Sequence, residues 1–210
     1  MTEPVGRSAR KRMSILTAGQ ELFLASGYHG TSVDAIAASA AVSKQTVYKH
    51  FGDKHELLMA IVDEVLETTV SAFLERVSLL ADTTDLERDL TALAGDYLRA
   101  VLREPVVQLR RLVVGEANRL PELAALYYDR APRRMLSAFA DCFTRLDQRG
   151  LLRVRGEPDT AAEHFAFLVV GRCIDQALFC GGPAVESALD VEHQVQAAVR
   201  VFLDGYRPEG

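Results

Sequence analysis

The 210-residue chain contains no tryptophan and only three cysteines. Cys142, Cys173 and Cys180 show neither a CxxC pair nor a Cys/His ligand spacing, so the sequence predicts no disulfide framework, no metal site and no cofactor. We expect these cysteines to serve as small apolar side chains, with a redox-sensing thiol as the less favoured alternative. The longest apolar runs are shorter than the roughly 18 residues of a membrane helix, so we expect no membrane partner.

Signals for secretion and for catalysis are also missing. The amino-terminal stretch MTEPVGRSARKRM has no apolar segment after its basic residues, which predicts a cytoplasmic protein whose first seven residues are disordered. A glycine-rich phosphate loop, a nucleophile elbow and an HExxH motif are all absent from the sequence. We therefore expect no enzyme, and turnover of a bound small molecule would be the observation in favour of that rival.

Lysine is scarce, and its placement is informative. The net charge is −5, yet all four lysines lie at or before residue 54. Residues 1–56 carry seven basic and five acidic side chains, whereas the remainder carries 17 and 24. A small basic surface on an acidic body favours docking on nucleic acid through one face rather than unspecific coating.

The segment from Thr31 to Glu56 predicts two short helices joined by a tight turn, followed by the start of a third helix. Thr31 or Ser32 is placed to cap the first helix, whose apolar positions recur at helical spacing: Val33, Ile36, Ala37 and Ala40. Ser43 is placed to cap the second helix, Lys44 to about His50, which buries Val47 and Phe51. Asp53 and Glu56 have the spacing of a reciprocal capping box.

The second of these helices is polar on its free face. That face carries Lys44, Gln45, Thr46, Tyr48, Lys49 and His50. Lysine and tyrosine donate to phosphates, and glutamine and threonine can read base edges in the major groove. Periodicity alone leaves open a solvated helical hairpin in an ordinary all-α domain.

The spaced run T-S-x-x-x-I-A-x-x-A-x-V-S-x-x-T-x-Y-x-H-F, between Thr31 and Phe51, resembles the DNA-binding head of TetR-type transcriptional regulators. The resemblance continues at Lys54 and Leu57 and covers roughly residues 8–60, with upstream agreement at Ile15, Leu22, Phe23, Gly27 and Tyr28. One departure is Ala41, where the family usually has a glycine in the turn. If that backbone requires a positive φ, alanine costs about 1 kcal/mol.

The resemblance implies a role for each polar position. Base contacts fall to Gln45 and Thr46, with Lys44 and Lys49 as further candidates. Contacts to the DNA backbone fall to Arg10, Arg12, Thr31, Ser32, Tyr48, His50 and Lys54. Two of these have plainer alternatives, because His50 can satisfy the carbonyls at its helix end and Tyr48 can pack partly in the core.

The rest of the chain predicts helices only. We expect an all-α fold of about nine helices, with a helix-turn-helix DNA-binding domain over residues 8–55 and a larger effector-binding and dimerisation domain over residues 56–207. A helix from Asp53 to about Leu80 connects the two, with a possible kink at Thr68 to Val70. Gly150 ends a helix, and Gly181 to Pro183 separates two final helices at about 159–180 and 187–206.

The resemblance also implies a homodimer, because TetR-type proteins pair through their last two helices. The interface candidates on these helices are Ala166, Cys173, Ala177, Val195 and Phe202. The alternative is that both helices only complete the core of one chain. A two-fold pair would present two reading helices to major grooves about 34 Å apart on a pseudo-palindromic double-stranded DNA operator.

A small-molecule effector is the last implied partner. Residues Arg111 to Pro132 resemble the body of the AefR-like subgroup, and TetR-type bodies enclose a pocket for a small, largely apolar effector. The candidate lining residues, most of which could equally be plain core, are Tyr97, Leu109, Leu112, Val113, Glu116, Tyr127, Phe139, Phe143, Phe165, Leu168 and Arg172. We expect a repressor released by that effector, with an activator or an effector-independent architectural protein as alternatives.

Overall fold

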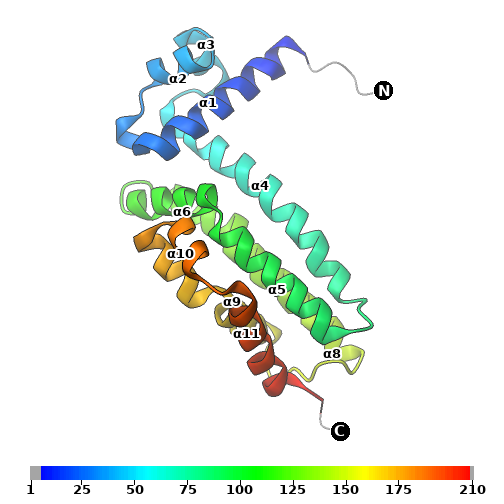
Figure 1. Cartoon of the computed structure of the whole chain (residues 1–210). Coiled ribbons are helices and arrows are strands. Elements are labelled where there is room, and N and C mark those ends of the chain that lie inside the picture. Colours follow the sequence, from blue (N-terminus) through cyan, green and yellow to red (C-terminus); the bar gives the residue numbers. More distant parts are fainter. Residues whose placement is uncertain (1–5, 209–210) are drawn as a thin grey trace. The chain divides into compact units, whose positions relative to one another are not determined.

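A computed structural model describes residues 6–208, and the fold is all-α as predicted (Figure 1). These residues form eleven α-helices and one π-helical turn, with no strand among them. None of these helices is long and apolar enough to cross a membrane. The chain divides into two compact units: unit 1 comprises Met1–Glu67 and Arg111–Tyr127, and unit 2 comprises Thr68–Arg110 and Tyr128–Gly210.

Unit 1 is built around the predicted three-helix head. It contains α1 (Arg7–Gly30), α2 (Val33–Ser39), α3 (Lys44–Phe51), the first part of α4 (Lys54–Leu80), the end of α6 (Glu104–Glu116) and nearly all of α7 (Pro121–Tyr128). Helix α1 packs against α2 and α3. The side chains that hold this head together are fully or almost fully buried: Ile15, Phe23, Ile36, Val47 and Leu57.

Unit 2 is a helical bundle centred on α9. It contains α5 (Leu86–Leu102), η1 (Asp129–Arg133), α8 (Arg134–Gln148), α9 (Pro158–Cys180), α10 (Gly182–Ala188) and α11 (Val191–Tyr206). Helix α9 packs against α5, α8, α10 and α11 (Figure 1). Most of its small and apolar residues face these neighbours, whereas Glu163, His164, Arg172 and Asp175 lie on its exposed face.

Aromatic rings fill the centre of this bundle. Phe139 contacts Phe165 edge-on with ring centroids 5.0 Å apart and stacks on Phe143 at 5.9 Å. The cluster continues through Phe165 and Phe202 at 5.2 Å, and Phe202 stacks on Tyr206 at 4.6 Å. Offset and edge-to-face aromatic pairs add stabilisation beyond the area they bury, so this cluster fixes how α8, α9 and α11 pack.

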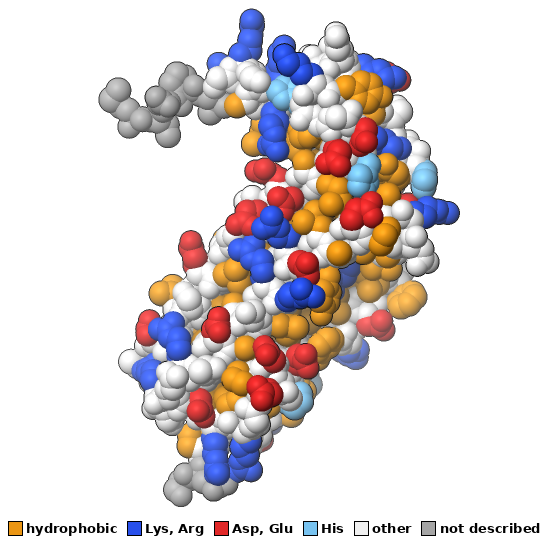
Figure 2. Space-filling view, turned by 180° about the vertical axis from the view of Figure 1, so that it is seen from behind, with side chains coloured by type: hydrophobic (Ala, Val, Ile, Leu, Met, Phe, Trp, Pro, Cys, Tyr) orange, Lys and Arg blue, Asp and Glu red, His pale blue; other side chains and the backbone are white. Residues whose placement is uncertain are grey.

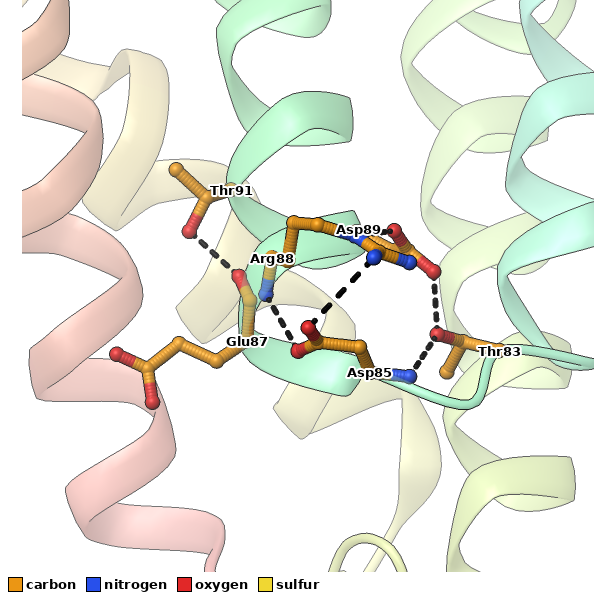
Figure 3. A network of polar contacts seen from close by, with 6 residues as sticks. All are labelled: Thr83, Asp85, Glu87, Arg88, Asp89 and Thr91. Atoms are coloured by element: carbon orange, nitrogen blue, oxygen red, sulfur yellow. Dashed lines mark hydrogen bonds and ion pairs between the residues drawn. The ribbon is translucent and has the colours of Figure 1, made fainter.

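The start of α5 is held by a polar network (Figure 3). Asp85 caps the helix by accepting a hydrogen bond from the Arg88 backbone N–H at 3.2 Å, as its sequence position predicts. The Arg88 guanidinium and the Thr83 hydroxyl both donate to the Asp89 carboxylate. These two donors stabilise the charged form and hold the pKa of Asp89 below its usual value.

Several helix boundaries differ from the prediction. Gly27 does adopt a positive φ of 71°, but helical structure resumes after it and continues to Gly30. Helix α4 is continuous from Lys54 to Leu80, so the helix is not broken at Thr68 to Val70. The segment after Gly181 forms the short helix α10, and the last helix begins at Val191 because Asp190 caps it. Of the seven residues predicted to be disordered, residues 1–5 lie outside the described part of the chain, and Arg7 is helical.

Ala41, in the turn of the helix-turn-helix, has the positive φ that is typical of the glycine usually found at this position. Ala41 has a φ of 52°, a left-handed conformation that is strained for a residue with a Cβ atom. Ala41→Gly is therefore expected to raise the free energy of unfolding by up to about 1 kcal/mol, as measured by urea denaturation. The matched control is Ala38→Gly within α2, which should lower it by about 0.5–1 kcal/mol. Equal destabilisation by both changes would contradict the strain at Ala41.

Candidate nucleic-acid interface

Helix α3 is too short to be stable alone, and its neighbours fix it from both ends. Ser43 caps it, with the hydroxyl accepting from the Thr46 backbone N–H at 3.2 Å. Val47 and Phe51 are buried against α1 and α2. Ser32 caps α2 in the same way through the Ala35 N–H. The predicted N-caps at Ser32 and Ser43 are confirmed, and α3 is held by its cap and by its buried apolar face.

The remaining face of α3 is open to solvent. Lys44, Gln45, Tyr48 and Lys49 are exposed, whereas Thr46 and His50 are half-buried. Figure 2 shows Lys and Arg side chains gathered at the end of unit 1 that carries the start of α1 and the helix-turn-helix. Hydrogen-bond donors on a fixed, exposed helix are what major-groove reading requires.

Two of the candidate base-reading side chains already have partners in the protein. The Lys44 ammonium lies 2.9 Å from the Asp34 carboxylate of α2. The Thr46 hydroxyl lies 2.8 Å from the Ser43 hydroxyl, which ties it to the helix cap. Gln45 is exposed at the first turn of α3, the part of a recognition helix that meets base edges.

Two residues predicted to contact phosphates, Thr31 and Lys54, already have partners within the protein. Thr31 is 3% exposed, and its hydroxyl donates to the carbonyls of Leu22 and Gly27 at the end of α1. The Lys54 ammonium donates to the carbonyls of Tyr28 and Thr31 and lies 4.2 Å from the centre of the Tyr28 ring. These contacts do not support the expected phosphate roles, because they already use the Thr31 hydroxyl and two of the three Lys54 donors.

The two arginines of α1 that were predicted to contact DNA, Arg10 and Arg12, are exposed, and their settings differ. Arg12 lies over the Phe51 ring, 5.4 Å from its centre, and forms a 3.8 Å ion pair with Glu64. Arg10 lines a groove on unit 1 together with Arg7, Lys11, Ser14 and residues 40–42 of the turn. Arg7 and Lys11 were not predicted as contacts, although their basic character and their spacing on α1 from Arg10 and Ser14 were visible in the sequence.

The five residues predicted to form a dimer interface are buried in unit 2. Ala166, Cys173, Ala177, Val195 and Phe202 are at most 4% exposed, so they have no surface to offer a second copy. The large apolar side chains exposed on the same two helices are Phe167, Phe179 and Val201, at 67%, 81% and 57%. Phe167 and Val201 line one surface groove with Glu163, His164, Leu168 and Tyr206. The prediction chose small residues within the apolar run of α9, which the structure places on the buried face of that helix.

The predicted effector-pocket residues separate into different settings. Phe139, Phe143 and Phe165 are fully buried in the aromatic cluster, and Tyr97 and Leu168 pack against it. Leu109 is also buried, whereas Arg172 is exposed. Leu112, Val113, Glu116 and Tyr127 belong to unit 1. The lining of an effector pocket therefore stays a prediction.

The cysteines differ strongly in exposure. Cys142 and Cys173 are buried and Cys180 is exposed, and burial raises the pKa of the Cys142 thiol to about 12. Because the thiolate is the reactive form, iodoacetamide at pH 8 should modify Cys180 in the folded protein while Cys142 reacts only after unfolding. Mass spectrometry of tryptic peptides measures this. Rapid modification of Cys142 without urea would contradict its placement in the core.

A short, capped helix with an exposed polar face and a basic setting defines a helix-turn-helix DNA-binding protein. Residues 15–61 match the family described as bacterial regulatory proteins of the tetR family. Residues 88–208 match the AefR-like transcriptional repressor C-terminal domain. The chain therefore belongs to the TetR family of DNA-binding transcriptional regulators, and its body is of the AefR-like subgroup.

Known relatives agree with this assignment. A crystal structure assigned to the TetR family, from Mesorhizobium loti MAFF303099, is 33% identical, has a TM-score of 0.87, and the match covers 96% of this chain and 99% of that one. The flavonoid-responsive regulator FrrA is 28% identical with a TM-score of 0.76 over 96% and 99% of the two chains. The uncharacterized HTH-type transcriptional regulator YezE of Bacillus subtilis is 24% identical over 75% of this chain and 76% of its own length.

Proposed function

We propose that the protein is a homodimeric repressor that binds a pseudo-palindromic operator through α3 and is released by a small, largely apolar effector. The observation that carries the DNA-binding part is the exposed polar face of α3, fixed by the Ser43 cap and by Val47 and Phe51. One such helix contacts few base pairs, whereas a genome offers very many competing sites. Two copies joined by a two-fold axis supply the missing contacts.

The dimer in this proposal uses the exposed face of α9 and α11. Phe167 and Val201 expose large apolar side chains on neighbouring helices and share one groove. Exposed apolar side chains that gather in one place usually mark a contact surface. A second copy placed on this face by a two-fold axis would bury the same side chains from both chains, as an isologous interface requires.

The proposed release depends on how α6 and α7 meet the head. Residues Arg111–Tyr127 belong to the same compact unit as α1 to α3. Two ion pairs join this segment to the rest of unit 1 when the histidines are protonated: His29 of α1 to Glu116 at 3.4 Å and His55 of α4 to Glu122 at 3.1 Å. An effector that shifts α6 would displace Glu116, and through these contacts it would act on the head. The differential affinity of the effector for the two states would set the size of the effect.

The chemistry of the effector follows from similarity only. FrrA is described as flavonoid-responsive and shares the fold over nearly the whole chain. A flat, mostly apolar aromatic molecule is therefore the first class to test here. An activator remains the second candidate, because the transcriptional activator FasR of Mycolicibacterium smegmatis is 37% identical over 39% of this chain and 36% of its own length.

Selection of duplexes from a random-sequence library by the purified protein tests the proposal. We expect a two-fold symmetric sequence to be enriched. Gln45→Ala should weaken binding to the enriched duplex by about 1–3 kcal/mol and binding to random duplex very little, measured by fluorescence anisotropy. Gln148→Ala, on α8 in unit 2, is the control and should change neither affinity. Failure to enrich any sequence would overturn the proposal.

A further inference from the structure

The helix-turn-helix carries an acidic side chain at its reading surface. Asp34 lies in the first turn of α2, and its carboxylate accepts a hydrogen bond from the Lys44 ammonium at 2.9 Å. Both side chains are well exposed, at 70% for Asp34 and 48% for Lys44. Lys44 is the first residue of α3, so the pair lies at the end of the helix that meets base edges.

This pair alters what Lys44 offers to DNA. Attraction and hydrogen bonding by Asp34 raise the Lys44 pKa, so the side chain stays charged but is already neutralised by a carboxylate. A phosphate of random duplex must displace that carboxylate, and it must also approach a second negative charge. Affinity for unspecific DNA depends on the number of phosphates that cations neutralise. The pair therefore lowers by one the number of phosphates that the protein can neutralise.

We propose that Asp34 is a specificity-determining residue, which withholds Lys44 from phosphates of random DNA and releases it only where a base edge replaces the carboxylate. This inference rests on the proposed DNA-binding function. At the operator, a guanine can accept from a lysine through O6 and N7, which compensates for the lost ion pair. On other sequences Lys44 finds no such pair of base acceptors, so unspecific affinity falls more than specific affinity does. The protein then distinguishes its operator from other DNA by binding the other DNA more weakly.

Asp34→Asn tests this proposal, because it removes the charge and keeps a side chain of the same shape. We expect affinity for random-sequence duplex to rise about two- to fivefold, while affinity for the selection-enriched duplex changes less. The slope of log affinity against log salt on random duplex should steepen by about 0.9, the contribution of one more neutralised phosphate. Asp34→Glu keeps the charge and should restore wild-type discrimination.

Two controls separate this effect from general charge and from misfolding. Asp141→Asn makes the same chemical change at an exposed position of α8 in unit 2, and it should leave both affinities unchanged. In a Lys44→Ala background, Asp34→Asn should have no further effect on random duplex. Circular dichroism melting of each variant verifies that the head is folded.

The outcomes distinguish this proposal from the function on which it rests. If the wild-type protein enriches no duplex, the DNA-binding proposal itself fails. If the wild type binds and folded Asp34→Asn keeps the wild-type affinity and salt slope on random duplex, the role of Asp34 is overturned. An equal gain from Asp34→Asn with and without Lys44 would also overturn it, because the carboxylate would then act by simple repulsion.

Discussion

Replacing Phe139 by alanine is expected to lower the free energy of unfolding by about 3–5 kcal/mol. Phe139 is fully buried and contacts the rings of Phe73, Tyr97, Phe143 and Phe165. Alanine would leave a cavity between packed helices that cannot close around it. The free-energy cost of that cavity adds to the loss of the buried apolar surface of the ring. Urea denaturation followed by circular dichroism at fixed protein concentration measures the change.

Leu79→Ala is the matched control for this loss. Leu79 lies near the end of α4 and is 69% exposed, so its truncation should stay within about 0.5 kcal/mol of wild type. A loss below 1 kcal/mol for Phe139→Ala would mean that the rings do not form the close-packed core described for unit 2. It would instead favour the predicted effector pocket, whose lining can lose a side chain at little cost.

Phe167→Glu is expected to convert the proposed dimer into a monomer and to abolish tight operator binding. Phe167 is 67% exposed beside Val201, and it adjoins the acidic Glu163 in the same groove. Two copies of the variant would bring four carboxylates together in an apolar interface, where uncompensated charge is strongly unfavourable. Loss of the paired head should weaken binding to the enriched duplex by about 100-fold or more, since linked sites raise overall affinity by such factors.

Light scattering after size-exclusion chromatography gives the oligomeric state, and fluorescence anisotropy gives the affinity. Leu79→Glu introduces the same charge at an exposed apolar position of another helix and should remain dimeric. A Phe167→Glu protein that is still dimeric and still binds the duplex would place the interface elsewhere on the chain. A wild-type protein that is monomeric at micromolar concentration would contradict the dimer altogether.

The sequence was most informative where the determining signals are local. Caps were predicted correctly at Ser32, Ser43 and Asp85 because a polar side chain and its backbone donor lie three residues apart. The strained turn at Ala41 was visible as a departure from an expected glycine. At Asp53 only half of the capping box forms: its carboxylate accepts from the Glu56 N–H, while its own N–H donates to the Phe51 carbonyl.

Features set by tertiary packing were missed. Residues 165–170 of α9 are apolar throughout, so this run alone did not distinguish buried Ala166 from exposed Phe167, although the polar residues on either side of it lie on the exposed face. The pairing of Lys44 with Asp34 depends on how α2 meets α3, and the contact of His29 with Glu116 joins residues far apart in the sequence. The roles of Thr31 and Lys54 at the end of α1 were likewise invisible, because a threonine or lysine beside a recognition helix is equally typical of a phosphate contact.

The proposed function requires that α3 enter the major groove twice per dimer. Dimethyl sulfate protection of guanine N7, read on the selection-enriched duplex, measures major-groove occupancy at single-base resolution. We expect two symmetric clusters of protected guanines, about one helical turn or a multiple apart on the same face of the duplex, and weaker protection in Gln45→Ala. A single cluster, or a pattern that Gln45→Ala and Lys44→Ala leave unchanged, would contradict the assignment of α3 as the reading helix.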